Sequence, residues 1–148
     1  MIRRGGAEDV EQIVAIFEPS FATLDFLPQL HTHEENLAFF TRAIAGGEAY
    51  LHGDDGFALL DGDLLSHIYV RPEALGRGIG HALFEHAKSV RPAGFEFWVF
   101  QQNERARRFY EAHGAEPVEF TDGAGNEERT PDVRYAWRPA GGRGSSGR

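Results

Sequence analysis

The sequence predicts an α+β domain, and two kinds of pattern support this prediction. Short apolar runs separated by Asp55-Gly56 and by Asp61-Gly62 predict strands joined in hairpins. Elsewhere, apolar residues recur every three or four positions, which is typical of amphipathic helices. With 148 residues, 41% of them hydrophobic, the chain has enough apolar side chains for one core.

The N-terminal elements are a strand and a helix. Residues 2–4 are expected to form the strand, and the spacing of apolar residues in 7–18 predicts the helix. We expect Pro19 to end this helix, because proline lacks the N–H that the next turn requires. Residues 20–31 are then expected to form an irregular connection with several large apolar side chains.

A second helix and an antiparallel meander follow. Thr32 and Glu35 have the spacing of a capping box, so the helix should begin at Thr32, and Gly46-Gly47 should end it. The meander consists of three predicted strands, which cover residues 48–52, 57–61 and 64–70.

The second half of the chain predicts two more helices and three more strands. In order, we expect a helix from the glycine cluster to about Val90, a strand at 95–100, a helix at 103–113 ended by Gly114, and strands at 117–120 and 133–137. These elements bring the prediction to a mixed, mostly antiparallel sheet of six to seven strands flanked by about four helices. A single domain would span residues 1–138, and the Gly- and Ser-rich residues 139–148 would be a disordered tail.

Composition narrows the range of functions. Fifteen basic against 23 acidic residues give a net charge of −8, which argues against nucleic acid as a partner and favours a cationic or amine substrate. No apolar run approaches the roughly 18 residues of a membrane span, and no signal sequence is evident, so we expect a cytoplasmic protein without membrane contact. No cysteine is present, and no His, Asp or Glu group has convincing metal-ligand spacing, so no metal is expected.

A glycine-rich loop lies between a predicted strand and a predicted helix. Alternating glycines let the backbone turn tightly and present N–H groups to an anion, and the helix N-terminus adds its positive dipole end. No Gly-Lys-Ser/Thr motif is present, and His81 stands where a dinucleotide-binding fingerprint requires glycine, so neither nucleotide motif fits. The loop residues are Leu75, Gly76, Arg77, Gly78, Ile79 and Gly80.

The stretch from Ser66 to Gly80 resembles the cofactor motif of the GNAT superfamily of acyl-CoA-dependent N-acyltransferases. The resemblance implies that the loop amides bind the pyrophosphate of acetyl-CoA and that the preceding strand follows the pantetheine arm. Ile68, Tyr69 and Val70 would lie along that arm. One position departs from the motif: Leu75 replaces the usual Gln or Arg, which should weaken binding without abolishing it.

A second stretch, from Asn103 to Gly114, resembles the other signature of this superfamily. Asn103 should cap the helix that follows, and the resemblance implies that it also contacts the pantetheine. By the same resemblance, Tyr110 is the general acid that protonates the departing CoA thiolate, a task suited to a phenol with a pKa of about 10.

The general base is less clearly indicated. The positions where many members of the superfamily carry a glutamate correspond to Leu64 and Trp98, and neither side chain accepts a proton. Glu96 lies two residues from Trp98 on the same strand face and is the candidate base, although a solvated strand carboxylate explains it as well.

These features favour an N-acetyltransferase that moves the acetyl group of acetyl-CoA to a primary amine, with a small-molecule amine as the expected acceptor. The resemblance also makes a homodimer possible. The alternative is a non-catalytic acyl-CoA sensor, which the residues Leu75, Leu64 and Trp98 favour and Tyr110 disfavours.

Overall fold

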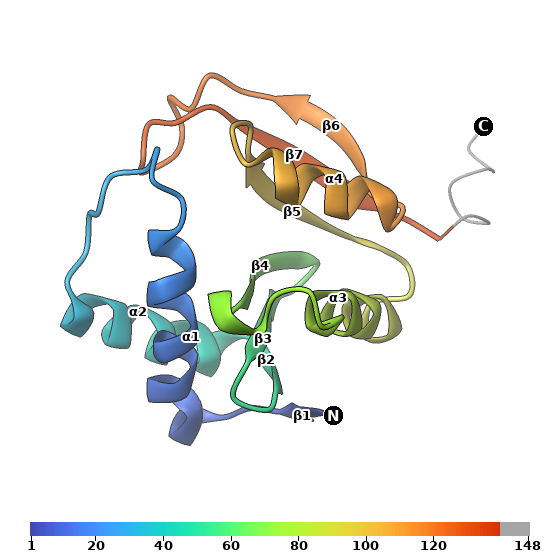
Figure 1. The fold of residues 1–148 in the computed structure, drawn as a ribbon. Coiled ribbons are helices and arrows are strands. Elements are labelled where there is room, and N and C mark those ends of the chain that lie inside the picture. Colours follow the sequence, from blue (N-terminus) through green and yellow to red (C-terminus); the bar gives the residue numbers. More distant parts are fainter. Residues whose placement is uncertain (140–148) are drawn as a thin grey trace. The chain divides into compact units, whose positions relative to one another are not determined.

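The computed structural model describes residues 1–139, where it contains seven β-strands and four α-helices (Figure 1). The chain forms two compact units, Met1–Ala87 and a second that begins at Lys88. Strand pairing is antiparallel within each unit. These features confirm the predicted α+β class with its mostly antiparallel strands. No helix in residues 1–139 has the length and apolar character needed to span a membrane.

The first unit contains a four-stranded antiparallel sheet. Its four strands lie side by side in chain order, and the pairing register of the last two shifts between Leu59 and Leu60. The predicted meander is therefore confirmed, with boundaries within one residue of those expected. The strands are β1 (Ile2–Arg4), β2 (Glu48–His52), β3 (Gly56–Asp61) and β4 (Leu64–Val70).

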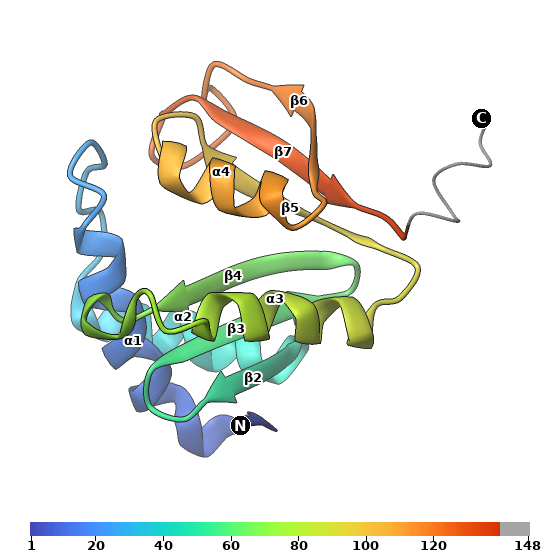
Figure 2. The ribbon, with the colours of Figure 1, turned by 45° about the vertical axis from the view of Figure 1, so that its right-hand side comes forward.

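Helices cover both faces of this sheet. Helices α1 (Val10–Ala22) and α2 (His33–Gly46) pack on one face, where Phe40, Leu51 and Phe57 belong to the buried core. Helix α3 (Ile79–Val90) lies along the other face (Figure 2). The alternation of side chains along β2 and β3 thus supplies two apolar surfaces, one for each layer of helices.

The prediction for the first helix is wrong at both ends. Residues Ala7–Asp9 form a 3₁₀ turn, and α1 continues through Pro19 to Ala22. Proline removes only one backbone hydrogen bond in this last turn. The Ser20 hydroxyl is 2.7 Å from the carbonyl oxygen of Ile16 and 2.9 Å from that of Val70, so it ties the turn to the end of β4.

Helix α2 begins as the sequence predicts. The Thr32 hydroxyl accepts a hydrogen bond from the Glu35 amide at 3.1 Å, and the Glu35 carboxylate accepts one from the Thr32 amide at 2.9 Å. The capping box is therefore complete, and Gly47 ends the helix.

The second unit contains three antiparallel strands and one helix. The strands lie in the order β5 (Phe95–Phe100), β7 (Asp132–Trp137) and β6 (Glu116–Phe120), and α4 (Glu104–Ala112) packs against one face. Phe95, Phe97, Val99, Val133 and Tyr135 are buried. The predicted strand pair at the C-terminus is confirmed.

Lys88, the only lysine of the chain, contacts two other elements of this second unit. Its ammonium donates a hydrogen bond to the His113 carbonyl at 2.9 Å and lies 5.2 Å from the Trp137 ring centroid. The end of α3 is thereby joined to the end of α4 and the end of β7. The predicted disordered tail lies, from residue 140 on, outside the described residues.

Candidate active site

The glycine loop has the backbone that its sequence predicts. Gly76 and Gly78 have φ angles of +83° and +80°, in the region that side chains with a Cβ rarely adopt. A Cβ at either position would meet no atom within 4 Å, so backbone conformation, not crowding, requires glycine. The loop is exposed from Leu75 to Gly78, and its amides can therefore reach a ligand.

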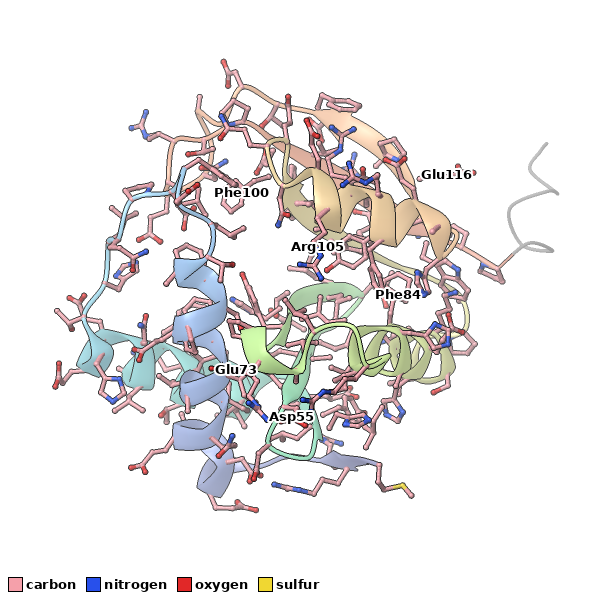
Figure 3. The ribbon with its side chains drawn as sticks, viewed as in Figure 1. Asp55, Glu73, Phe84, Phe100, Arg105 and Glu116 are labelled. Atoms are coloured by element: carbon pink, nitrogen blue, oxygen red, sulfur yellow. The ribbon has the colours of Figure 1, made fainter. Side chains whose placement is uncertain are left out.

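The start of the loop is held by Arg71. Its amide donates to the Asp55 carbonyl at 2.8 Å, and its Nε donates to the Asp55 carboxylate at 2.5 Å. A weaker contact of 3.5 Å joins Arg71 to Glu73. Figure 3 labels Asp55, in the turn between β2 and β3, and Glu73, just after β4. These contacts fix the chain where it leaves β4 and enters the loop.

The loop leads directly into α3, whose first residues present backbone N–H groups without intrahelical partners. The first helical bond runs from the Ala82 amide to the Gly78 carbonyl at 3.0 Å. The Ile79 side chain is 5% exposed and packs toward β3, because a Cβ on Gly56 would lie 2.9 Å from it. Ile79, like Gly80, can therefore bind an anion only through its amide, whereas the exposed Arg77 can also do so through its guanidinium.

Strand β4 carries the three residues predicted to follow the cofactor arm. In the register, Ile68 is opposite Ala58 and Val70 is opposite Gly56. The Tyr69 ring packs against Phe17, with a centroid distance of 5.2 Å. The Tyr69 side chain therefore packs on the face covered by α1 and α2, and only the backbone of this residue can contact a ligand.

Asn103 caps α4 as predicted. Its side-chain oxygen accepts a hydrogen bond from the Ala106 amide at 3.3 Å, and its own amide donates to the Phe100 carbonyl at 3.0 Å. The strand end and the helix start are therefore joined through one residue.

Tyr110 lies on the face of α4 that packs on the sheet and is only partly buried. Its ring centroid is 4.6 Å from that of Phe97 and 5.2 Å from that of Phe109. Asn103 and Tyr110 are seven residues apart, which is about two helical turns. The structure thus places both predicted residues of the second signature along one side of α4.

Glu96 lies on the opposite face of β5 from Tyr110, because it alternates with Phe97, which contacts the tyrosine. Its carboxylate accepts from Arg134 at 3.0 Å and from Arg138 at 3.4 Å. These two ion pairs, which were not evident from the sequence, join β5 to β7 and to Arg138, the residue after β7.

The described part of the chain contains no group of three or more His, Asp or Glu side chains that could hold a metal ion. The histidines that flank Thr32 interact with nearby carboxylates instead. His33 is 3.0 Å from Glu18, and His31 is 3.5 Å from Glu35.

Comparison with known proteins decides the family. Residues 33–114, more than half of the chain, match the model of the acetyltransferase (GNAT) domain. The chain is 35% identical over 118 residues to the peptidyl-lysine N-acetyltransferase YjaB of Salmonella typhimurium, covering 76% of this chain and 81% of that protein. The chain belongs to the GNAT family of acetyltransferases.

A second GNAT relative is YjaB of Escherichia coli, at 37% identity over 120 residues, with 76% of this chain and 80% of that protein covered. The solution structure of its apo form superimposes with a TM-score of 0.73 at 28% identity, over 93% of this chain and 96% of that one. The fold is also that of the PaiA N-acetyltransferase of Thermoplasma acidophilum, solved in complex with coenzyme A (TM-score 0.73, 19% identity, 94% and 98% covered). As a GNAT enzyme, the protein is an acetyl-CoA-dependent N-acetyltransferase.

Leu75 marks the departure of this GNAT loop from the usual Gln or Arg. Its side chain is 44% exposed. We expect Leu75→Arg to raise the affinity for acetyl-CoA by about five-fold, because a guanidinium there adds a charged donor for the diphosphate. Isothermal titration measures the change. Leu30→Arg is the matched control, since Leu30 is also 44% exposed but lies outside the loop; equal gains in both variants, or none at position 75, would contradict the assignment.

His67 on β4 is a residue whose surroundings the sequence did not reveal. Its ring lies among aromatic side chains of α1, α2 and β4, with centroid distances of 5.0 Å to Phe40, 5.6 Å to Phe39 and 6.2 Å to Phe17. Burial among these rings lowers the pKa of His67 from 6.5 to about 4. The imidazole is therefore neutral at physiological pH.

A lowered histidine pKa predicts a loss of stability in acid. The unfolded chain takes up a proton on His67 below pH 6.5, whereas the folded chain does so only near pH 4. The free energy of unfolding should thus decrease between these values, by at most about 2 kcal/mol from pH 7 to pH 5. Urea unfolding at both pH values measures it. His67→Phe should lose this dependence, whereas replacing the exposed His81 by Gln should retain it; equal pH dependence in the wild type and His67→Phe would refute the explanation.

The sequence also missed a polar network on α4. Arg107 and Glu111 both reach the hydroxyl of Tyr135 on β7. Arg107 and Glu111 are four residues apart and therefore lie on one side of the helix, and this spacing could have predicted that they act together. What they pair with depends on the position of β7.

Proposed function

We propose that this GNAT enzyme acetylates lysine side chains of proteins. The names of the relatives support this acceptor: both YjaB proteins, at 35% and 37% identity, are peptidyl-lysine N-acetyltransferases. A small-molecule amine, which the sequence led us to expect, is the competing acceptor.

In the proposed reaction, the amides of Leu75 to Gly80 bind the diphosphate of acetyl-CoA, and the backbone of Ile68 to Val70 pairs with its arm. The support for this role is the pair of positive φ angles at Gly76 and Gly78 beside a helix N-terminus. Asn103, which caps α4, would also contact this arm.

The chemical step is direct attack by a neutral amine on the thioester carbonyl carbon. The new C–N bond forms as the C–S bond breaks, and the Tyr110 phenol gives its proton to the departing thiolate. The amine also loses a proton, which Glu96 accepts through water, because its carboxylate lies on the face of β5 opposite Tyr110.

The role of Glu96 has a structural alternative, because its two ion pairs also join β5 to β7. We expect Glu96→Gln to lower kcat about ten-fold and to change the pH profile of turnover. Steady-state rates and thermal melting measure both effects. A fall in melting temperature without a change in kcat or in the pH profile would remove Glu96 as the base.

The acceptor class is tested with an N-terminally blocked peptide that contains one lysine, against free lysine and an aliphatic diamine. Because the chain has no cysteine, the CoA thiol released can be measured without a protein background. We expect kcat/KM for the peptide to exceed that for either free amine by about ten-fold. A higher value for a free amine would contradict the peptidyl acceptor and favour the small-molecule one. The same peptide with arginine in place of lysine is the control.

A further inference from the structure

Tyr135 lies at the centre of the network that joins α4 to the sheet of the second unit. It is fully buried on β7, and its ring stacks on Phe97 with a centroid distance of 5.5 Å and an interplanar angle of 7°. Its hydroxyl accepts a hydrogen bond from Arg107 Nε at 3.0 Å and donates one to Glu111 Oε2 at 2.5 Å. Both hydrogen-bonding capacities of this hydroxyl are therefore used by one helix.

The two partners bracket Tyr110 along α4. Arg107 precedes it by three residues and Glu111 follows it by one, so the Tyr135 hydroxyl fixes the helix on both sides of the proposed general acid. None of the α4 residues is fully buried, so apolar packing constrains the rotation of this helix less than that of a core helix. A polar contact with directional geometry is then well suited to set its orientation.

The aromatic rings make a second connection. Phe97 touches both tyrosines, because its centroid is 4.6 Å from that of Tyr110 and 5.5 Å from that of Tyr135. The two tyrosine centroids are 6.5 Å apart. A shift of Tyr135 is therefore transmitted to Tyr110 both through the helix and through the shared phenylalanine.

The protonation state of the network agrees with this arrangement. Burial raises the pKa of Tyr135, and its bond to Glu111 raises it further, so the phenol keeps its proton at neutral pH. It can then donate to Glu111, while the Arg107 guanidinium, whose pKa this contact raises, stays charged and donates to it.

We propose that Tyr135 is a positioning residue for catalysis, holding α4 through Arg107 and Glu111 so that the Tyr110 hydroxyl stays aimed at the sulfur of the leaving group. This inference rests on the proposed role of Tyr110. Tyr135 itself does not touch the reacting atoms, and its effect is indirect.

The test is a double-mutant cycle of Tyr110→Phe and Tyr135→Phe, since the second change removes a hydroxyl but keeps the ring. We expect Tyr135→Phe to lower kcat about ten-fold while KM for acetyl-CoA changes less than about two-fold. In the Tyr110→Phe background it should have no further effect on kcat, because it acts through that residue. Arg108→Gln is the matched control, as Arg108 pairs only with the exposed Glu104 on the same helix among the contacts seen in the described chain.

The outcomes separate the two proposals. If Tyr110→Phe lowers kcat but Tyr135→Phe does not, the positioning role is wrong and the acid role stands. If Tyr110→Phe has no effect, the acid role fails and the inference fails with it. Additive effects in the double variant would also overturn the inference. Should Tyr135→Phe melt too low to assay, Glu111→Leu, which removes the acceptor of the Tyr135 hydroxyl, provides the same cycle with the same expectation of non-additivity.

Discussion

Replacing Tyr110 by Phe is expected to lower kcat about 100-fold or more while leaving the affinity for acetyl-CoA within about two-fold. The ring keeps its contacts with Phe97 and Phe109, and only the hydroxyl that would protonate the thiolate is lost. Release of CoA thiol gives kcat, and isothermal titration gives the affinity.

A matched control for this variant is Tyr50→Phe. The Tyr50 hydroxyl also makes a hydrogen bond, to Glu48 at 2.8 Å, but it lies on β2 of the first unit and takes no part in the proposed chemistry. It should change kcat by less than about two-fold. An unchanged kcat in Tyr110→Phe would show that another group, or water, supplies the proton.

Replacing Gly78 by Val is expected to weaken acetyl-CoA binding about 100-fold, because the φ angle of +80° is strained for any residue with a branched Cβ. Relief of that strain would turn the loop amides away from the diphosphate. Because a Cβ at this position meets no protein atom within 4 Å, the loss would arise from the backbone and from the ligand side.

Gly62→Val is the control for backbone strain. Gly62 also has a positive φ, +60°, and open space around its Cβ, but it lies in the turn between β3 and β4. Both variants should lose thermal stability, whereas only Gly78→Val should lose affinity. Equal affinities in the two variants would contradict the phosphate-binding role of the loop.

The parts of the fold that depend on local patterns could be predicted from the sequence. The capping box of Thr32 and the Asn103 cap need only residues three positions away, and both are formed. The positions of the strands, and of α3 and α4, likewise follow from the spacing of their own apolar residues. Pro19 is the exception, because Ser20 and its bond to the Val70 carbonyl hold the helix beyond it, and that partner is 50 residues away.

The surroundings of the candidate site residues were not predictable in the same way. The neutral state of His67 results from rings on α1 and α2, and the ion pairs of Glu96 result from the register of β5 against β7. Arg107 and Glu111 look like solvent-facing charges until Tyr135 is placed beneath them. Motif spacing thus identifies the residues, whereas their chemistry depends on contacts distant in sequence.

The most direct test of the central claim is calorimetric titration of the full chain with acetyl-CoA, and separately with ATP and NAD. The account predicts binding of acetyl-CoA with a dissociation constant in the micromolar range and no detectable binding of the other two. Equal binding of all three would mean that the loop is a general anion site, and an absence of acetyl-CoA binding would contradict the cofactor assignment on which the proposed chemistry depends.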